Sequence, residues 1–397
     1  MVHGLAIGGD GVTRASDGRV VFVPGALPGD EVVASWQESS KRWVRGELLE
    51  VVIASPARLT PPCPELARGC GGCGWQHFQP EEQRAAKRRL VADALTRLGH
   101  IDNPSISQGP ALAEWGYRTT VRVALDEGRA AFRKGESHEL VTVSSCAITH
   151  PALVELLAEC HFGDAEEVTL RVGGATGERL VSMAPPSSVR PHFPADVAIN
   201  THYHDVVAGR QWRISAESFF QTRTDGAELL VTEVAAHLAG ATTVLDAYGG
   251  VGLLAAAAPL GARITSVEAA RSSSADAAFN LADLGATVVN SAFERWHSEQ
   301  FDAVVADPAR RGLQREGVDT IAATGASKLL LVSCDAASLG RDAFQLYEAG
   351  YDHLDSELLD FFPHTPHVEV LSEFRLSSDR RPVAPTRTPT GSRRRRR

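Results

Sequence analysis

The chain has 397 residues, of which 43% are hydrophobic and 22% charged, and its formal net charge is −9 at pH 7. This length exceeds one typical hydrophobic core, so two or three domains are expected, and the acidic balance argues against indiscriminate binding of polyanions. No stretch approaches the ~20 apolar residues of a membrane span, and the first residues lack the pattern of a signal peptide. We therefore expect a cytoplasmic protein without a membrane anchor, and the sequence indicates no obligate protein partner.

Residues 1–57 are expected to form a small all-β unit. Runs rich in β-branched and aromatic residues, separated by glycine and proline turns, cover residues 19–24, 31–36 and 43–53. Strands of this size suit an OB-type barrel, a fold often used to carry oligonucleotides. Phe22, Trp36 and Trp43 could stack on bases, although aromatic residues in so small a barrel more often belong to its core. The order VVFVPGALPGD and then EVVASW resembles the TRAM domain of RNA-modifying enzymes.

The cysteines indicate a metal site rather than a disulfide framework, because the six of them are spread unevenly over a long chain. Three lie within eleven residues, from Cys63 through Cys70 to Cys73, and intervening glycines let backbone amides approach sulfur. A tetrahedral site needs a fourth ligand, for which Cys146 is the natural candidate and Cys160 and His77 are competitors. Zinc and a 4Fe-4S cluster both accept four thiolates, so the spacing does not choose between them.

A helix is predicted from Pro80 to about Leu98, with proline in its first turn and acids near its positive end. We expect its apolar stripe to pack on the C-terminal domain. Its basic side could face RNA or simply be solvated, and it comprises Arg84, Lys87, Arg88 and Arg89. Between residues 101 and 212, short strands and few helix signals predict a β-rich region. Cys146 would join this region to the loop over residues 63–73, here called the cysteine loop. Residues 58–212 are therefore expected to form a middle domain.

From residue 213 strands and helices alternate, which predicts a doubly wound, Rossmann-like α/β domain over 213–377. The predicted strands cover 243–246, 263–268, 301–307, 328–334, 353–361 and 368–376, and the predicted helices cover 252–260, 272–284 and 336–349. Residues 378–397 are rich in proline and threonine and end in five arginines, so we expect a disordered basic tail. This tail could add nonspecific affinity for nucleic acid or be a solvated end without function.

Four polar groups fall at carboxyl ends of predicted strands, where open α/β sheets bind ligands: Asp246, Glu268, Asp307 and Cys334. They are expected to share one cleft. Cys334 is a candidate nucleophile, with a buried thiol acting as a small hydrophobe as the alternative. For Asp307 the alternative is a turn acid or helix cap.

The segment Gly250-Val-Gly252-Leu-Leu-Ala matches a dinucleotide-binding loop, with Glu268 placed to bind a ribose. An NAD-dependent oxidoreductase is thus a rival interpretation. Asp246 distinguishes a dinucleotide cofactor from S-adenosylmethionine. A carboxylate just before the glycines would repel the pyrophosphate of a dinucleotide but would favour the cationic S-adenosylmethionine. The loop therefore favours a methyl donor, held by Asp246, Gly250 and Gly252.

Six motifs occur together and in a fixed order. They are Cys-x6-Cys-x2-Cys with Trp75-Gln-His77, Glu217-Ser-Phe-Phe-Gln221, Asp246-Ala-Tyr-Gly-Gly-Val-Gly252, Asp307-Pro-Ala-Arg310, Val332-Ser-Cys-Asp335 and Phe362-Pro-His-Thr-Pro-His-Val-Glu369. The set resembles the RNA 5-methyluridine methyltransferases, and more closely the TRAM-containing, iron-sulfur 23S rRNA branch than the shorter tRNA branch. The resemblance implies a multidomain α/β fold with a TRAM barrel, an iron-sulfur middle domain and an S-adenosylmethionine-dependent methyltransferase domain.

The resemblance also assigns roles to residues. It makes Cys334 the nucleophile and Glu369 the base that removes the proton from carbon 5 of uracil, with His364 and His367 as lesser alternatives for the base. The donor-binding residues that it implies are Gln221, Tyr248, Glu268 and Asp307. The 4Fe-4S ligands that it implies are Cys63, Cys70, Cys73 and Cys146. A tRNA methyltransferase and a noncatalytic RNA-binding iron-sulfur protein remain alternatives.

The chain departs from the family pattern in the six-residue first cysteine gap, in Thr222-Arg223 after the Phe-Phe-Gln motif, and at Leu253 and Asp335. These departures concern substrate preference rather than the reaction. That reaction needs a thiolate on carbon 6 of uracil to make carbon 5 nucleophilic, and a base to remove the carbon 5 proton. We expect the pKa of the Cys334 thiol to be lowered by the helix that follows it. The target uridine must also flip out of its stack.

Overall fold

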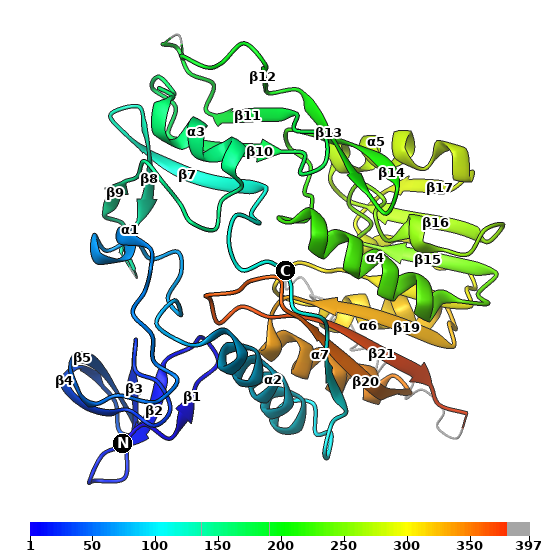
Figure 1. Ribbon diagram of the computed structural model, residues 1–397. Coiled ribbons are helices and arrows are strands. Elements are labelled where there is room, and N and C mark those ends of the chain that lie inside the picture. Colours follow the sequence, from blue (N-terminus) through cyan, green and yellow to red (C-terminus); the bar gives the residue numbers. More distant parts are fainter. Residues whose placement is uncertain (136, 190, 379–397) are drawn as a thin grey trace, which may run out of the picture.

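The computed structural model describes residues 1–378 except positions 136 and 190 (Figure 1). The predicted basic tail therefore lies almost entirely outside the described residues. A small N-terminal sheet and a β-rich middle part lie on one side of the molecule, and a large sheet covered by helices lies on the other. None of the helices described is both long enough and apolar enough to cross a lipid bilayer.

The N-terminal sheet has the order β1-β2-β3-β5-β4. Its strands are β1 (Gly4–Leu5), β2 (Gly11–Arg14), β3 (Val20–Val23), β4 (Glu31–Ser39) and β5 (Trp43–Ile53). Its core is small and contains Val21, Val23 and Val44. Trp36 and Trp43 are 57% and 38% exposed, so the expectation that they lie in the core is wrong. Both tryptophans lie on the two longest strands of this sheet, β4 and β5. The Arg19 guanidinium carbon lies 4.4 Å from the centroid of the Trp36 ring.

The middle part holds a six-stranded sheet of order β12-β11-β10-β7-β8-β9. Its strands are β7 (Thr120–Asp126), β8 (Arg129–Arg133), β9 (Leu140–Thr142), β10 (Glu167–Val172), β11 (Arg179–Ala184) and β12 (Val197–Ile199). A helix that was not predicted, α3 (Pro151–Glu159), packs Leu153, Leu156 and Leu157 on this sheet. Proline in its first turn and leucines at helical spacing were the signals that could have indicated it. The hairpin of β13 (His202–Val207) and β14 (Arg210–Ser215) leads to the C-terminal sheet.

The C-terminal sheet has eight strands in the order β17-β16-β15-β18-β19-β21-β20-β6. They are β17 (Thr287–Asn290), β16 (Arg263–Glu268), β15 (Thr243–Ala247), β18 (Ala303–Ala306), β19 (Lys328–Ser333), β21 (Glu369–Leu376), β20 (Tyr351–Leu359) and β6 (Ile106–Gln108). The strands from β17 to β19 are parallel, and β21 is antiparallel to both of its neighbours. The sheet is thus the doubly wound α/β arrangement that the sequence predicted.

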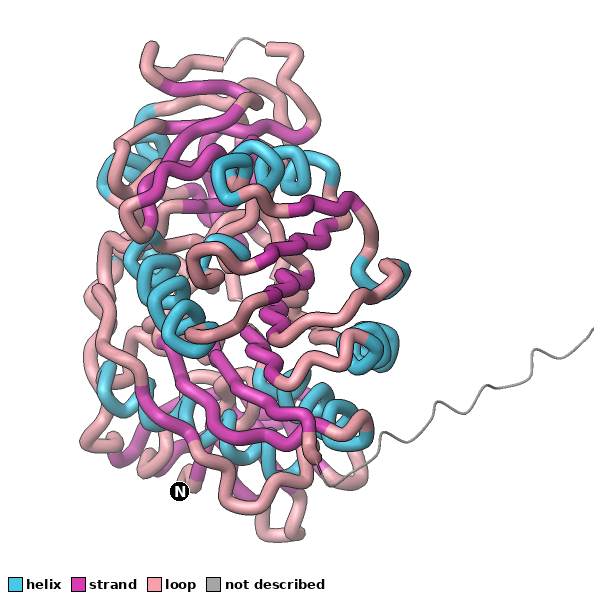
Figure 2. The backbone as a smooth tube through the Cα atoms, turned by 90° about the vertical axis from the view of Figure 1, so that its right-hand side faces the viewer, coloured by secondary structure: helices cyan, strands magenta, loops and turns pink. Residues whose placement is uncertain are grey.

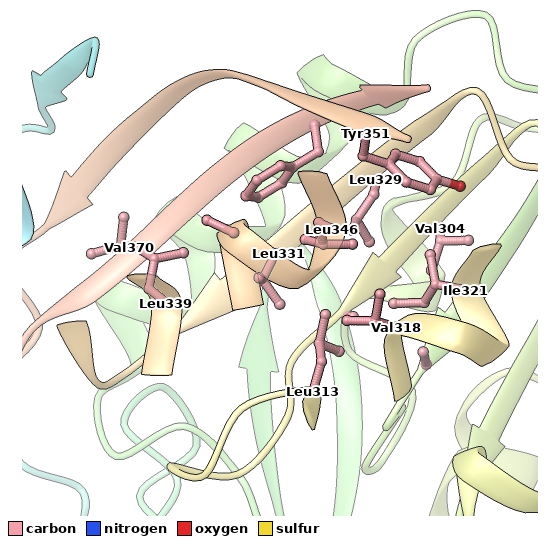
Figure 3. Close-up of a cluster of buried hydrophobic side chains, with 14 of the residues drawn as sticks. Val304, Leu313, Val318, Ile321, Leu329, Leu331, Leu339, Leu346, Tyr351 and Val370 are labelled. Carbon is pink, nitrogen blue, oxygen red and sulfur yellow. The ribbon is translucent and has the colours of Figure 1, made fainter. Parts of the chain in front are cut away.

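Helices cover both faces of this sheet, as the view turned by 90° shows (Figure 2). They are α4 (Thr224–Leu238), α5 (Arg271–Asn280), α6 (Gln314–Ala323) and α7 (Ala336–Glu348). Residues of β19 alternate between the two cores. Leu329 and Leu331 pack with α6 and α7 (Figure 3), whereas Leu330 and Val332 pack with α4. Burial on both faces explains why β19 is an uninterrupted apolar run.

Two predictions for this domain were incomplete. The helix expected over 252–260 is reduced to a 3-10 turn, η1 (Ala255–Ala257), because Gly252 has a φ of +92° and Pro259 ends the segment. Strand β17 and the helices α4 and α6 were not predicted. Two further 3-10 turns are η2 (Ala282–Leu284) and η3 (Phe293–Arg295).

Helix α2 (Pro80–Arg97) packs on the C-terminal domain, although α1 (Pro64–Ala67) and the cysteine loop precede it. Val91, Ala94 and Leu95 are buried in the core that includes α7. The contact is close, since a Cβ added at Gly340 of α7 would lie 2.5 Å from the Ala94 carbonyl oxygen. Lys87, which the sequence placed on a basic exposed side, is completely buried.

Candidate active site

Cys334 lies where β19 ends and α7 begins. Asp335 is the N-cap of α7, and its side chain accepts a hydrogen bond of 2.7 Å from the Ser338 N–H. This capping explains how an aspartate can follow the cysteine, because a side-chain oxygen there satisfies a free amide of the helix. The strand end and the capped helix together hold the thiol at the edge of the sheet.

A cavity of about 670 Å³ opens at this edge and collects most of the predicted site residues. Cys334, Glu369, Asp307, Gln221, Tyr248, Gly250 and Glu268 all line it. They come from the ends of β15, β16, β18 and β19, from the start of β21, and from the segment before α4. The expectation that the strand-end groups share one cleft is therefore confirmed for Glu268, Asp307 and Cys334.

The base candidate Glu369 and its neighbour Asp307 are buried carboxylates that affect each other. Burial raises the pKa of Asp307 to about 7. Burial, together with the nearby Asp307 charge, raises the pKa of Glu369 well above its usual range. Two buried carboxylates that lie close together disfavour the ionisation of each other.

The Cys334 thiol is affected in the same direction. Burial, and then the charges of Glu369 and Asp307, raise the pKa of Cys334 to about 12. The expected lowering of the Cys334 pKa by helix α7 is therefore wrong, because the lost solvation and then the negative neighbours act in the opposite direction. A cation bound in the cavity would act in the opposite direction on all three groups.

Asp246 lies beneath the glycine loop and lines a smaller hollow of about 50 Å³ beside the main cavity. It accepts hydrogen bonds from the Ala255 N–H (3.1 Å) and the Ser266 hydroxyl (3.4 Å), and burial raises its pKa to about 8. Glycine is required at position 249, where a Cβ would meet the Ser266 hydroxyl oxygen at 2.0 Å. The turn places Tyr248 at a φ of +62°, and its hydroxyl donates to Glu294 at 3.0 Å.

The two glycines predicted to bind the donor have different environments. The Gly250 N–H donates to Glu268 Oε2 at 2.9 Å on the cavity wall. Gly252 instead packs against Leu281, whose Cδ1 atom would lie 2.7 Å from an added Cβ. Gly252 therefore allows the loop to approach α5, and it is Gly250 that borders the cavity.

The cysteines predicted to bind a metal line one separate cavity of about 190 Å³, and all six cysteines of the chain are free thiols. The lining includes Cys63, Cys70, Cys73 and Cys146. The competitor Cys160 is buried instead among the leucines of α3. Within the described residues, no three His, Cys, Asp or Glu side chains stand in an arrangement that could hold a metal ion directly.

Some lining residues were not predicted. Arg118 and Arg310 border the main cavity, and Phe219, 61% exposed, lies at its wall. His367, named above as an alternative base, also borders it. Arg310 could have been found from its motif with Asp307, since both follow β18. Arg118 could not, because it comes from the middle part. His364, one alternative base, is buried and does not line the cavity. Its ring stacks on the Trp115 ring, with the two ring centroids 4.0 Å apart.

A basic hollow of about 770 Å³ lies along the middle sheet and shares Gly72 with the main cavity. Its basic lining residues are Arg122, Arg133, Lys134 and His138, and its one acidic lining residue, Glu167, forms an ion pair with Arg122. Gly72 also borders the cysteine cavity. The cysteine loop therefore lies where the three hollows meet.

The chain is similar to known proteins over nearly its whole length. A TRAM domain model matches residues 1–49. An uncharacterized RNA methyltransferase of Gloeobacter violaceus is 31% identical, over 95% of this chain and 96% of that protein. Others from Corynebacterium glutamicum and Streptomyces avermitilis are 32% and 30% identical, each over 93% of this chain and 94% and 95% of theirs.

Among solved structures, the tRNA (uracil-54, C5)-methyltransferase of Pyrococcus abyssi, in complex with S-adenosyl-L-homocysteine, superposes with a TM-score of 0.72. It is 22% identical, and the match covers 94% of this chain and 99% of that chain. This likeness establishes the shared fold and confirms the multidomain α/β architecture.

Proposed function

Because this chain belongs to the RNA methyltransferase family that its motifs indicated, we propose that it transfers a methyl group from S-adenosylmethionine to carbon 5 of a uridine in RNA. The observation that carries the proposal is the placement of the Cys334 thiol and the Glu369 carboxyl in one cavity. A nucleophile and a base are the two groups that this reaction needs from the protein.

In the proposed reaction, the Cys334 thiolate adds to carbon 6 of uracil, and the electron pair of the ring double bond moves onto the carbon 4 oxygen. Carbon 5 then attacks the methyl group of the donor, whose sulfur leaves with its bonding electrons. Glu369 takes the proton from carbon 5, and the bond between sulfur and carbon 6 breaks to restore the ring. A carboxylate with a raised pKa is a stronger base, which suits Glu369 to the removal of the carbon 5 proton once it is ionised.

The charge of the donor supports this assignment. S-adenosylmethionine carries a sulfonium cation, and a cation beside Asp307, Glu369 and Cys334 lowers the pKa of each group. Gln221, Tyr248, Gly250 and Glu268 line the same cavity and are the remaining donor-binding residues of the proposal, with Asp246 beside it. The Gln221 carboxamide already contacts Asp307 at 3.3 Å.

RNA is the proposed substrate, and the basic hollow that adjoins the cavity at Gly72 offers a path for its backbone. We propose 23S rRNA, because the motif set resembles that branch, and we place the reaction in the cytoplasm. Mapping 5-methyluridine in rRNA and tRNA from cells with and without the gene decides the target. Loss of the modification from tRNA alone would replace rRNA by tRNA.

Two variants test the reaction. Glu369→Gln is expected to accumulate a methylated, covalent protein-RNA adduct, because addition and transfer proceed while proton removal slows by roughly 100-fold or more. Cys334→Ala is expected to form no adduct. The measurement is a denaturing gel with labelled RNA and labelled donor, and RNA carrying 5-fluorouridine should trap the wild type. Equal turnover by both variants would contradict the proposal.

We further propose that Cys63, Cys70, Cys73 and Cys146 hold a 4Fe-4S cluster. The proposal rests on chemistry: four free thiols line one cavity, and four thiolates are the donor set of such a cluster. Zinc takes the same donor set, but no three of the described side chains surround the position of a single ion. When bound, the cluster would supply a covalent tie between the cysteine loop and the middle sheet. Protein purified without oxygen is expected to be brown and to contain iron and sulfide. Cys146→Ser should lose both, Cys160→Ser should keep them, and colourless protein with zinc would contradict the cluster.

A further inference from the structure

The loop over residues 360–368 joins β20 to β21 and leads directly into Glu369. Phe362, Thr365 and His367 of this loop line the active-site cavity, whereas His364 adopts a left-handed backbone with a φ of +64°. Glu369 is the first residue of β21 and pairs with Leu359 of β20, so the loop that joins these two strands determines how the chain enters the cavity at Glu369.

Gln83 of α2 holds the loop at its centre and is only 1% exposed. Its carboxamide oxygen accepts a hydrogen bond of 2.7 Å from the His364 N–H. Its carboxamide nitrogen donates to the carbonyl oxygens of Trp75 (3.0 Å) and Phe78 (2.7 Å). One neutral side chain thus connects the active-site loop to the segment that follows the cysteine motif.

Two buried cations hold the same loop nearer to β20. The Lys87 ammonium, one helical turn after Gln83, contacts Asp360 at 2.7 Å and the Phe362 carbonyl oxygen at 2.8 Å. The Arg223 guanidinium donates to the Asp360 and Phe361 carbonyl oxygens at 3.4 and 3.2 Å. Arg223 is one of the residues at which this chain departs from the family pattern.

The cysteine loop contributes a direct bond as well. The Trp75 N–H donates to the His364 carbonyl oxygen at 2.9 Å, two residues after Cys73. The Trp75 indole N–H donates to the Gly9 carbonyl oxygen at 3.2 Å. Segments from the N-terminal domain, the cysteine loop and α2 therefore converge on one turn, five residues before Glu369.

We propose that Gln83 is a positioning residue that sets the place of the 360–368 loop and, through it, the reach of Glu369 toward carbon 5. This inference rests on the proposed function. Gln83 does not line the active-site cavity, so thiol addition by Cys334, which directly follows β19, should be largely independent of it. Removal of the carbon 5 proton should depend on it, because a small displacement of a base costs roughly 100-fold in rate.

The test compares Gln83→Leu, which loses all of these bonds, and Gln83→Glu, which keeps the acceptor but loses both donors. Gln79→Glu is the matched control, because Gln79 is a half-buried residue at the same helix end whose side chain donates only to the Pro56 carbonyl oxygen and not to the 360–368 loop. Single-turnover reactions with labelled donor and RNA tritiated at carbon 5 separate adduct formation from proton release.

Both Gln83 variants are expected to accumulate the methylated adduct and to release tritium roughly 10- to 100-fold more slowly, with little change in the rate at which 5-fluorouridine RNA is trapped. The control should match the wild type. A parallel fall of trapping and release, unchanged kinetics, or failure of both variants to fold would overturn the positioning role. If the wild type itself traps no 5-fluorouridine RNA, the proposed function fails instead.

Discussion

At the level of single residues, the sequence located the candidate reactive groups but not the shifts in their pKa values. Cys334 and Asp307 could be placed because each follows a buried parallel strand, and such strands end at a common edge. The raised pKa values could not be predicted, because they arise from burial and from carboxylates far apart in the chain. Glu369 and Cys334 face one cavity only after the sheet has formed.

The raised pKa of Cys334 leads to a prediction about the reactivity of its thiol. Because the pKa of Cys334 is raised to about 12, its thiolate fraction should increase by about tenfold per pH unit between pH 7 and 10. The rate of alkylation by iodoacetamide, followed by mass spectrometry of the peptide that contains Cys334, should rise without a plateau. Cys334→Ala identifies the peptide by its loss, and a plateau below pH 9 would show that the thiol pKa is not raised.

At the level of elements, α2 shows how tertiary contacts change the meaning of a pattern. The apolar stripe on this helix could be predicted from the sequence, and in the structure it packs on α7. Lys87 was assigned to a basic exposed side because its neighbours in sequence are arginines. Its partner Asp360 is 273 residues away, so the buried ion pair could not be anticipated from helix periodicity.

Breaking this ion pair should destabilise the protein strongly. Lys87→Met leaves Asp360 without its cation in a buried site and should lower the free energy of unfolding by about 3–5 kcal/mol. Arg97→Met is the control on the same helix, because the Arg97–Asp93 pair is exposed and should contribute at most about 1 kcal/mol. Urea unfolding measures both. Adding Asp360→Leu to Lys87→Met should recover part of the loss, and similar effects for both single variants would contradict the importance of burial.

At the level of the whole molecule, the N-terminal sheet, the middle sheet and the active-site cavity supply surfaces of different chemistry. The N-terminal sheet exposes two tryptophans, and the middle sheet has a basic hollow that reaches the cavity at Gly72. Stacking and charge are the two means by which proteins hold unpaired RNA. Only the folded chain places the basic hollow beside the cavity that contains Cys334.

The tryptophans permit a prediction about RNA binding. Trp36→Ala and Trp43→Ala should each weaken RNA affinity by roughly 1–3 kcal/mol if a base stacks on the ring. The dependence of affinity on salt should stay unchanged, since no cation is removed. Fluorescence anisotropy with labelled RNA at two salt concentrations measures both quantities. Leu49→Ala, another exposed apolar residue of the same sheet, is the control, and an equal loss there would indicate general damage to the sheet.

The sequence by itself determined the order of the domains, the alternation that makes the C-terminal domain doubly wound, and the residues at its strand ends. These features follow from local propensity, hydrophobic periodicity and short motifs, which act within a few residues. Tertiary structure decided which of those residues share a cavity, that Gly252 packs on α5, that Lys87 is buried, and that the pKa of the Cys334 thiol is raised. Those properties depend on burial and on charges brought together from distant segments, which no local pattern encodes.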